Sequence, residues 1–321
     1  MKEAYLGIDI SKSTFDAALL VKDKFKTRKF DNNKQSFNKL MSWLNQKEVT
    51  LSKACMEATG VYSQPLAEFL YNQKIPVSVV NPARIKGFSQ SELTRSKNDI
   101  LDAKLIAKFC KLINPELWQP TPKPIKTLQH WVRRLDDLIA MHRQEKNRLE
   151  VADNDLKTHI QESIEHLQNK IKKVNTIIKD HINQHPDLKR KSELLQSIPG
   201  VGKATTAQVL AFIGEVNKFK SAKEVAAFIG LNPKQRQSGT SVNGRTRLSK
   251  TGDSALRKAF YMPAVVAIRY NPIIKEFCMR LEKAGKHKML IVGAVMRKLV
   301  HMIYGVLKTE TVFNANILKG T

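Results

Sequence analysis

The sequence predicts an α/β domain followed by an all-α remainder. Short apolar segments typical of strands are interspersed with helical patterns in the first third of the chain. Beyond them, apolar residues recur every three and four positions over two long stretches, and a helical pair joined by a glycine-containing turn follows. We therefore expect an α/β domain over 1–118, a coiled-coil and linker region over 119–190, and a helical domain over 191–321.

The composition indicates a nucleic-acid partner. The 321 residues include 55 Lys and Arg against 29 Asp and Glu, a formal net charge of +26. Such an excess favours a polyanion over a small-molecule substrate. No stretch approaches the roughly 20 apolar residues that span a bilayer, and the chain starts without a signal-peptide pattern, so we expect no membrane. Three scattered cysteines without metal-type spacing indicate a reduced, cytoplasmic protein that has no zinc site.

The N-terminal domain is expected to form a mixed sheet. Three strand patterns follow one another as a meander, and later strands alternate with helices, which is typical of a sheet with both strand directions. The expected strands cover 5–10, 15–21, 24–30, 53–56 and 77–81, and the expected helices cover 37–44 and 62–72.

Four acids stand at places where a carboxylate is unusual. Asp9 interrupts an apolar strand and Glu57 ends another, while Asp99 and Asp102 share one face of a helix start. A buried carboxylate is costly unless it is paired or binds a metal. Each acid also has a simpler explanation, such as a turn cap, an exposed strand end, or attraction to the helix dipole. All four together favour a site for a cation.

A basic segment lies just before this helix. Residues 81–97 carry Arg84, Lys86, Arg95 and Lys97 among Ser, Gly and Gln. This composition predicts a loop whose cations face a phosphate backbone. A solvated loop without a ligand fits the same composition.

The middle of the chain is expected to be a helical seam. Pro120, Pro122 and Pro124 indicate a linker. Two stretches, 125–139 and 160–178, then show the apolar spacing of coiled coils. They fit an intramolecular hairpin or a dimer seam equally well. Of these two alternatives we favour the intermolecular one, in a homo-oligomer, a dimer or tetramer.

The last third opens with what looks like a helix-hairpin-helix motif. Helices over 191–197 and 203–212 flank a turn that contains Gly200 and Gly202, followed by Lys203. Glycine lets backbone N–H groups approach a phosphate at a helix N-terminus. A plain hairpin, in which glycine only serves the turn, is the alternative.

Helices are expected to complete the chain. Ser221 and Glu224 form a capping-box pattern for a helix that ends at Gly230. Asp253 is expected to cap another helix, Asn271 a third, and a long apolar helix covers 287–307. The methionines on these helices are expected to pack in the core; they are Met262, Met289, Met296 and Met302.

Taken together, these segments resemble one family. The stretches GIDISK, MEATG and KNDILDA around Asp9, Glu57 and Asp99 look like those of DEDD transposases of the insertion-sequence-110 type, which are related to Piv-type DNA invertases. A later block, with GLNP, QSGTS and LSKTGD, resembles the family's second motif. The resemblance implies a RuvC/RNase H-like N-terminal domain and a helical C-terminal transposase domain.

It also implies a chemistry. Asp9, Glu57, Asp99 and Asp102 would hold Mg²⁺ or Mn²⁺, hard cations that prefer oxygen ligands. A serine would attack a DNA phosphate and form a phosphoserine link; Ser238 matches best, ahead of Ser241 and Ser249. Cations near these serines would offset charge on the reacting phosphate; they are Arg236, Arg245, Arg247, Lys250 and Arg257.

The implied partners are donor and target DNA duplexes and a structured non-coding guide RNA. We expect a cytoplasmic, nucleoid-associated prokaryotic protein. Two alternatives remain open at this point. A RuvC-like structure-selective nuclease would need the four acids but not Ser238. A nucleic-acid-binding architectural protein would need neither, and the four intact acids argue against it.

Overall fold

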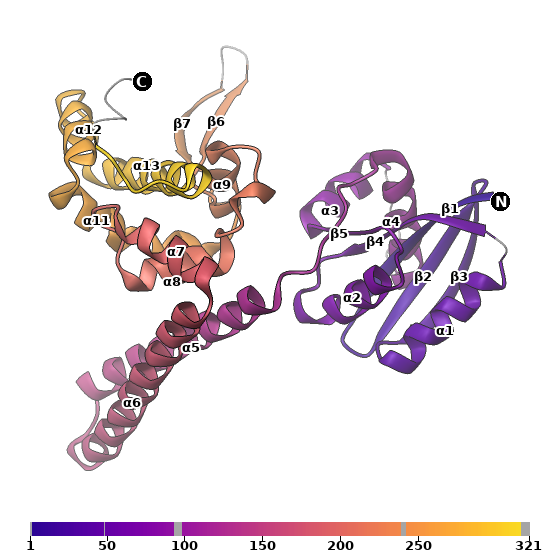
Figure 1. The fold of residues 1–321 in the computed structure, drawn as a ribbon, viewed down its shortest axis with the longest axis horizontal. Coiled ribbons are helices and arrows are strands. Elements are labelled where there is room, and N and C mark those ends of the chain that lie inside the picture. The colour runs from indigo at the N-terminus through magenta and orange to yellow at the C-terminus, as the bar shows by residue number, and fades with distance from the viewer. Residues whose placement is uncertain (1, 48, 93–97, 239–241, 316–321) are drawn as a thin grey trace. The chain divides into compact units, whose positions relative to one another are not determined.

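The structure is a computed structural model that describes residues 2–47, 49–92, 98–238 and 242–315; the side chains of residues 2 and 235–246 are not described. The chain divides into two compact units, Met1–Thr121 and Pro122–Thr321 (Figure 1). The expected three-part division stays a prediction.

The N-terminal unit is built on a five-stranded mixed sheet, as predicted. Its strand order is β3-β2-β1-β4-β5. The meander pairs antiparallel, whereas β1 pairs parallel with β4, and β4 with β5. Every expected strand is present; the bounds are β1 Lys2–Ile10, β2 Thr14–Val21, β3 Lys24–Asp31, β4 Val49–Glu57 and β5 Val77–Val80.

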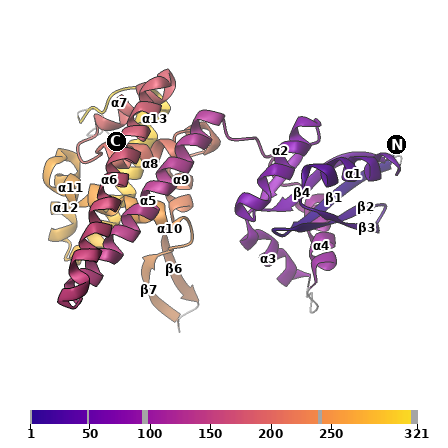
Figure 2. The same ribbon diagram turned by 90° about the horizontal axis from the view of Figure 1, so that it is seen from below.

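Helices cover both faces of this sheet. Figure 2 shows α1 (Lys34–Asn45) and α2 (Gln64–Asn72) on one side, and α3 (Pro82–Ser91) and α4 (Asp99–Ile113) on the other. The first pair packs on alternate residues of the meander, in a core that includes Ile8, Phe15 and Leu40. This arrangement agrees with the RNase H-like fold that the family resemblance implies.

Helix α4 lies unusually close to the sheet. A Cβ on Gly7 of β1 would stand 2.2 Å from both the carbonyl oxygen of Ala103 and the backbone nitrogen of Ala107. Glycine is therefore required here by a close backbone approach. As a result, the face of β1 that carries Gly7 is the face against which α4 packs.

One predicted loop is a helix. The segment after β5 was expected to be irregular over 81–97, but α3 occupies Pro82–Ser91. Asn81 caps it, because its Oδ1 accepts a hydrogen bond from the Ala83 N–H at 2.8 Å. Asn at the N-cap and Pro at the first position are start signals, and the polar composition of the segment obscured them.

The middle of the chain forms a helical hairpin within one chain. Helices α5 (Lys123–Glu150) and α6 (Asn154–Gln184) lie side by side (Figure 1). Seam residues of both helices are buried, among them Leu128, Val132 and Val174. The intramolecular alternative thus accounts for the apolar spacing, and a homo-oligomer stays a prediction.

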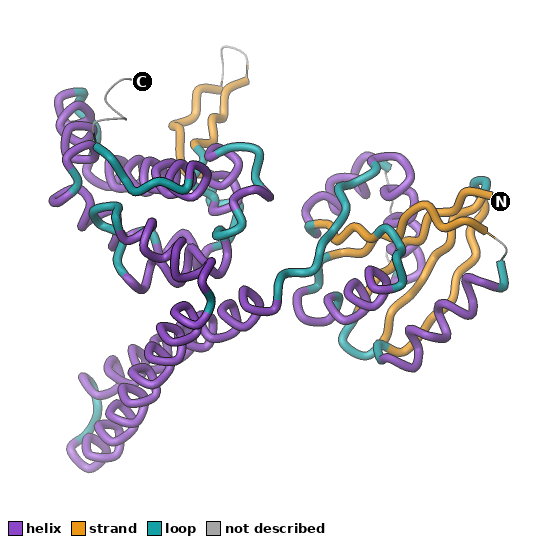
Figure 3. The backbone as a smooth tube through the Cα atoms, viewed as in Figure 1, coloured by secondary structure: helices purple, strands orange, loops and turns teal. Residues whose placement is uncertain are grey.

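The rest of the second unit is helical except for one β-hairpin, which the sequence did not predict. Figure 3 shows its two strands, β6 (Pro233–Ser238) and β7 (Val242–Leu248), in orange. The expected helices are all present, with the expected caps at Ser221, Asp253 and Asn271. They are α7 Pro186–Gln196, α8 Lys203–Phe212, α9 Ala222–Ile229, α10 Ser254–Ala259, α11 Tyr261–Tyr270, α12 Pro272–Lys283 and α13 Lys288–Thr309.

Helix α13 corrects two expectations. By length and composition it is apolar enough to cross a membrane, the one such helix in the described part of the chain, although no stretch of this kind was expected. More than half of it is buried inside the unit, and Met296 and Met302 lie in the core as predicted. Met289 on α13 and Met262 on α11 are instead 58% and 61% exposed, so their assignment to the core was wrong.

Candidate acidic site and nucleic-acid interface

A row of charged residues crosses the sheet on the side of α4. Asp9 lies two residues after Gly7 on β1 and therefore points to the same face. On β4, Glu57 follows Met56, which is the register partner of Ile8, so Glu57 stands beside Asp9. The two acids that end or interrupt strands thus come from neighbouring parallel strands.

The other two predicted acids lie at the start of α4. Asn98 caps the helix, because its Oδ1 accepts from the Leu101 N–H at 2.8 Å. Asp99 and Asp102 both lie in the first turn, at the positive end of the helix dipole. The predicted helix start is confirmed. The close packing of α4 on Gly7 brings this end of the helix towards the row on the sheet.

The electrostatics show that the four acids share one region. The pKa of Asp9 is raised to about 6, first by burial and then by repulsion from Asp102, Asp99 and Glu57, with a smaller contribution from Asp16. Repulsion of this kind disfavours the ionised form of Asp9 until a cation offsets it. The sequence therefore identified residues that the fold brings together.

The donor set fits a hard divalent cation in its chemistry. Glu57 of β4 and Asp99 and Asp102 of α4 act on the half-buried carboxylate of Asp9 on β1. Oxygen donors of this kind are the ligands that Mg²⁺ prefers. Among the described residues, however, no three Asp, Glu, His or Cys side chains stand close enough together to hold an ion as they are placed. Side-chain movement is needed to close the site.

Two charged residues of this region were missed by the sequence analysis. Asp16 on β2 is the register partner of Asp9, and Lys29 on β3 is the register partner of Asp16. The Lys29 Nζ lies 3.5 Å from Asp16 Oδ2 and 3.7 Å from Asp99 Oδ2. Asp16 also interrupts an apolar strand, so the reasoning that identified Asp9 applies equally to it.

A surface hollow adjoins the acids. Its volume is about 460 Å³, and basic and polar side chains of β3 form one wall opposite the start of α4. Its lining residues are Asp16, Thr27, Arg28, Lys29, Asn98, Asp99 and Ile100. The hollow therefore brings the basic side chains of Arg28 and Lys29 next to the carboxylate of Asp99.

The predicted basic segment is only partly described. Arg84 and Lys86 are exposed on α3, and the Arg84 guanidinium lies 5.5 Å from the centre of the Phe109 ring. Arg95 and Lys97 lie outside the described residues. A role for these four cations in binding nucleic acid stays a prediction.

The two glycines of the helical hairpin turn differ. Gly200 has a φ of +103°, and a Cβ there would stand 2.7 Å from the Cβ of Ala267, so this glycine serves the turn and its packing on α11. Gly202 has no atom within 4 Å of an added Cβ and is open to a ligand. Lys203 is the first residue of α8. A Cβ at Gly200 would thus clash with α11, whereas one at Gly202 would meet open space, and a role of either glycine in binding phosphate stays a prediction.

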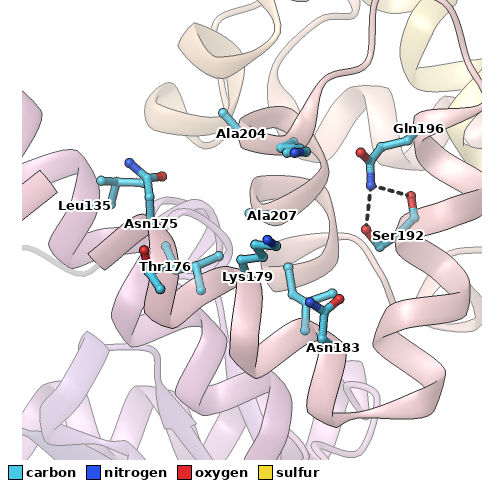
Figure 4. Close-up of a pocket in the computed structure, with 12 residues that line it drawn as sticks. Leu135, Asn175, Thr176, Lys179, Asn183, Ser192, Gln196, Ala204 and Ala207 are labelled. Atoms are coloured by element: carbon cyan, nitrogen blue, oxygen red, sulfur yellow. Dashed lines mark hydrogen bonds between the residues drawn. The ribbon is translucent and has the colours of Figure 1, made fainter. Parts of the chain in front are cut away.

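A cavity of about 410 Å³ lies next to this hairpin, between α5, α6, α7 and α8 (Figure 4). Its wall is mixed: Leu135 and Ala207 are apolar, while Lys179 and Lys203 supply positive charge. On one side, the Gln196 amide donates to the Ser192 hydroxyl at 2.8 Å. No sequence pattern predicts this cavity, because it forms where four helices meet.

The competing serines lie on and next to the β-hairpin. Ser238 is the last residue of β6 and pairs in register with Val242 at the start of β7, although its side chain is not described. Ser241 lies outside the described residues. Ser249 follows β7, and its N–H donates to the Asn232 carbonyl at 2.8 Å. Ser238 therefore stands near the tip of a β-hairpin rather than on an irregular loop.

The basic residues near these serines have different environments. Arg247 and Lys250 are exposed, whereas the side chains of Arg236 and Arg245 are not described. Arg257 is partly buried, and its Nη1 donates to the carbonyls of Ile229 and Lys250 at 3.1 and 3.3 Å. Arg257 thus joins the end of α9 to the segment after β7.

Comparison with known proteins matches each of these two regions to a family of transposases. Residues 192–279 match the family described as "Transposase IS116/IS110/IS902 family", and residues 6–152 match a second family described as "Transposase". The chain is 34% identical over 321 residues to the pilin gene-inverting protein of Moraxella bovis, covering 99% of both chains. The corresponding Moraxella lacunata protein gives the same identity and coverage. A 43.6 kDa protein of the insertion element IS110 from Streptomyces coelicolor is 26% identical over 129 residues, 40% of this chain and 32% of that one.

Proposed function

This chain belongs to the IS116/IS110/IS902 family of transposases, and from that premise we propose that it cleaves and rejoins DNA strands with an acidic metal site and a serine nucleophile. The observation that carries the proposal is the convergence of Asp9, Glu57, Asp99 and Asp102 from three elements of the N-terminal unit. DEDD transposases in general use a divalent metal ion. In this proposal the four carboxylates are the ligands of that ion.

The four acids would bind the cation from two sides, the sheet and helix α4. The half-buried Asp9 and the strand-end Glu57 lie on neighbouring strands of the sheet, from which they would hold the cation. Asp99 and Asp102 join from the first turn of α4. When bound, Mg²⁺ or Mn²⁺ would polarise a DNA phosphate and offset the charge that develops on its oxygens.

The serine step makes a covalent intermediate. The Ser238 hydroxyl attacks the phosphorus, its oxygen forms a bond to phosphorus, and the bond from phosphorus to one deoxyribose oxygen breaks. The hydroxyl proton passes to a carboxylate of the acidic site, and the leaving oxygen takes up a proton. This chemistry requires both units at one phosphate, within a chain or between protomers, and the exposed cations Arg247 and Lys250 would offset phosphate charge.

The experiment traps the reaction midway on a DNA substrate whose cleaved strand cannot be rejoined. We expect protein linked covalently to DNA in the wild type, and no adduct in Ser238→Ala. The variants Ser241→Ala and Ser249→Ala are matched controls, because they remove the same hydroxyl from the same region. Asp102→Asn is expected to abolish cleavage while DNA binding persists.

Each outcome distinguishes a mechanism. Free DNA ends without an adduct in the wild type would support the alternative, a RuvC-like nuclease that hydrolyses DNA without a covalent intermediate. An adduct that disappears only in Ser241→Ala or Ser249→Ala would move the nucleophile to that residue. Cleavage that survives Asp102→Asn would contradict the metal site.

We further propose that a structured non-coding RNA pairs with donor and target DNA, so that base pairing selects the sequence while the protein recognises backbone and shape. The charge of +26 supports a chain that holds RNA and two duplexes as a dimer or tetramer in the prokaryotic cytoplasm, on the nucleoid. Preferential binding of a transcript from the DNA flanking the gene, compared with a scrambled transcript, is the test.

A further inference from the structure

We propose that Lys29 is a built-in counter-ion of the acidic site, anchored by Asp16, which pairs with Asp99 and competes with the divalent cation for that carboxylate. The inference rests on the proposed function, because it assumes that Asp99 is a metal ligand. It assigns roles to two residues outside the four-acid motif. Both are positioning residues in this scheme.

The register of the sheet places the pair at the site. Asp9, Asp16 and Lys29 are direct partners across β1, β2 and β3, so their side chains share the face covered by α4. The ammonium of Lys29 stands between strand and helix, 3.5 Å from Asp16 Oδ2 and 3.7 Å from Asp99 Oδ2. It therefore links the row on the sheet to the first turn of α4.

Burial shows which acid is the anchor. The Asp16 side chain is 8% exposed, and its ion-pair partner among the described residues is Lys29. A buried carboxylate needs such a partner. The Asp99 side chain is 67% exposed, so it has access to water and to other cations. In this scheme Asp16 keeps its ion pair with Lys29, whereas Asp99 can replace Lys29 by another cation.

The Lys29 side chain also has space into which it can move. Its side chain is 55% exposed on the edge strand β3, and it lines the hollow of about 460 Å³ beside the acids. A divalent cation on Asp99 would repel the ammonium. A DNA phosphate lying in the hollow would then attract it. The Lys29 ammonium would thus pair with the acids before the metal binds and with a DNA phosphate afterwards.

The test measures Mn²⁺ affinity of the full chain without DNA, from the free Mn²⁺ signal in electron paramagnetic resonance. Because Lys29→Met removes the competing cation, we expect Mn²⁺ to bind about three- to fivefold more tightly. Lys29→Arg keeps the charge and should restore affinity close to that of the wild type. Lys26→Met is the matched control: Lys26 is an exposed lysine on the same strand but on the opposite face.

A double-mutant cycle tests the anchor. Asp16→Asn releases Lys29 from β2, so the gain from Lys29→Met should be smaller in the Asp16→Asn background than in the wild type. Equal gains in both backgrounds would remove Asp16 from the scheme. An unchanged or weaker Mn²⁺ affinity in Lys29→Met, or an equal gain in Lys26→Met, would overturn the competition.

The proposed function fails in a different way. If the wild type binds no Mn²⁺ and Asp102→Asn changes nothing, the acids are not a metal site, and both proposals fall together. If the wild type binds Mn²⁺ and Asp102→Asn abolishes binding while Lys29→Met behaves like the wild type, the metal site stands and only the counter-ion role is wrong.

Discussion

Among single residues, Asp9 has a carboxyl whose pKa is raised first by burial and then by repulsion from neighbouring acids. Its pKa is about 6 in the folded, metal-free chain, above the ordinary value of 3.8. Between these two pH values the folded state binds more protons than the unfolded state, so stability falls as the pH rises through this window. At neutral pH the ionised Asp9 therefore destabilises the metal-free protein.

Replacing Asp9 by Asn should remove this penalty. Near pH 7.5 in EDTA we expect Asp9→Asn to stabilise the N-terminal unit by roughly 1 kcal/mol, less than the full pKa shift implies because the carboxyl is only half buried. Near pH 4 the gain should vanish, because Asp9 is then mostly protonated. Urea unfolding followed at both pH values measures the difference, and a gain of equal size at both would contradict the assignment.

Residue-level prediction succeeded where a local rule was enough. An acid inside an apolar strand is visible in the sequence, which identified Asp9, and the same rule would have found Asp16. The position of Lys29 could not be predicted, because its pairing with Asp16 and Asp99 depends on strand register and on the position of α4. The packing of Gly200 could not be predicted for a similar reason: the Ala267 side chain that an added Cβ would meet is distant in the chain.

At the scale of elements, the position of α4 decides whether the acids can meet. Gly7→Ala would push a Cβ into backbone atoms of Ala103 and Ala107, which cannot move without the helix. We expect a loss of about 1–3 kcal/mol in unfolding free energy and weaker Mn²⁺ binding, because Asp99 and Asp102 move with α4. Thermal unfolding and Mn²⁺ titration of the same sample measure both effects.

A second glycine provides the control for this substitution. Gly87 lies inside α3 with nothing within 4 Å of an added Cβ. Gly87→Ala should therefore stabilise the unit by about 0.5–1 kcal/mol, through lower entropy of the unfolded chain, and leave Mn²⁺ affinity unchanged. If both variants behaved alike, close packing of α4 on β1 would not be what holds the acids in place.

Elements were predicted well where apolar periodicity dominated. The strands of the first sheet and the helices α7, α8 and α13 follow from alternation, spacing and caps. Three elements were missed. Helix α3 carries few apolar residues, and the strands β6 and β7 are polar sequences that pair with each other, so none of the three shows the periodicity of a buried face.

In the whole molecule, core and charge are divided between the two units. The cores of the first unit contain no residue beyond 118, and the core of the second begins at Ile125. The charge is uneven: residues 122–321 carry 36 Lys and Arg against 17 Asp and Glu, whereas residues 1–121 carry 19 against 12. The composition that predicted a nucleic-acid partner therefore applies mainly to the second unit.

Separate expression of residues 1–121 and 122–321 tests this division. Since each has its own core, we expect both fragments to unfold cooperatively. The 122–321 fragment should keep most of the affinity of the full chain for duplex DNA of arbitrary sequence. Its affinity for DNA should fall roughly a thousandfold between about 50 and 200 mM salt if some six phosphates are neutralised. Fluorescence anisotropy of a labelled duplex over a salt series measures both. Equal affinity and equal salt dependence in the 1–121 fragment would show that local patches, rather than the net charge of a unit, determine where DNA binds.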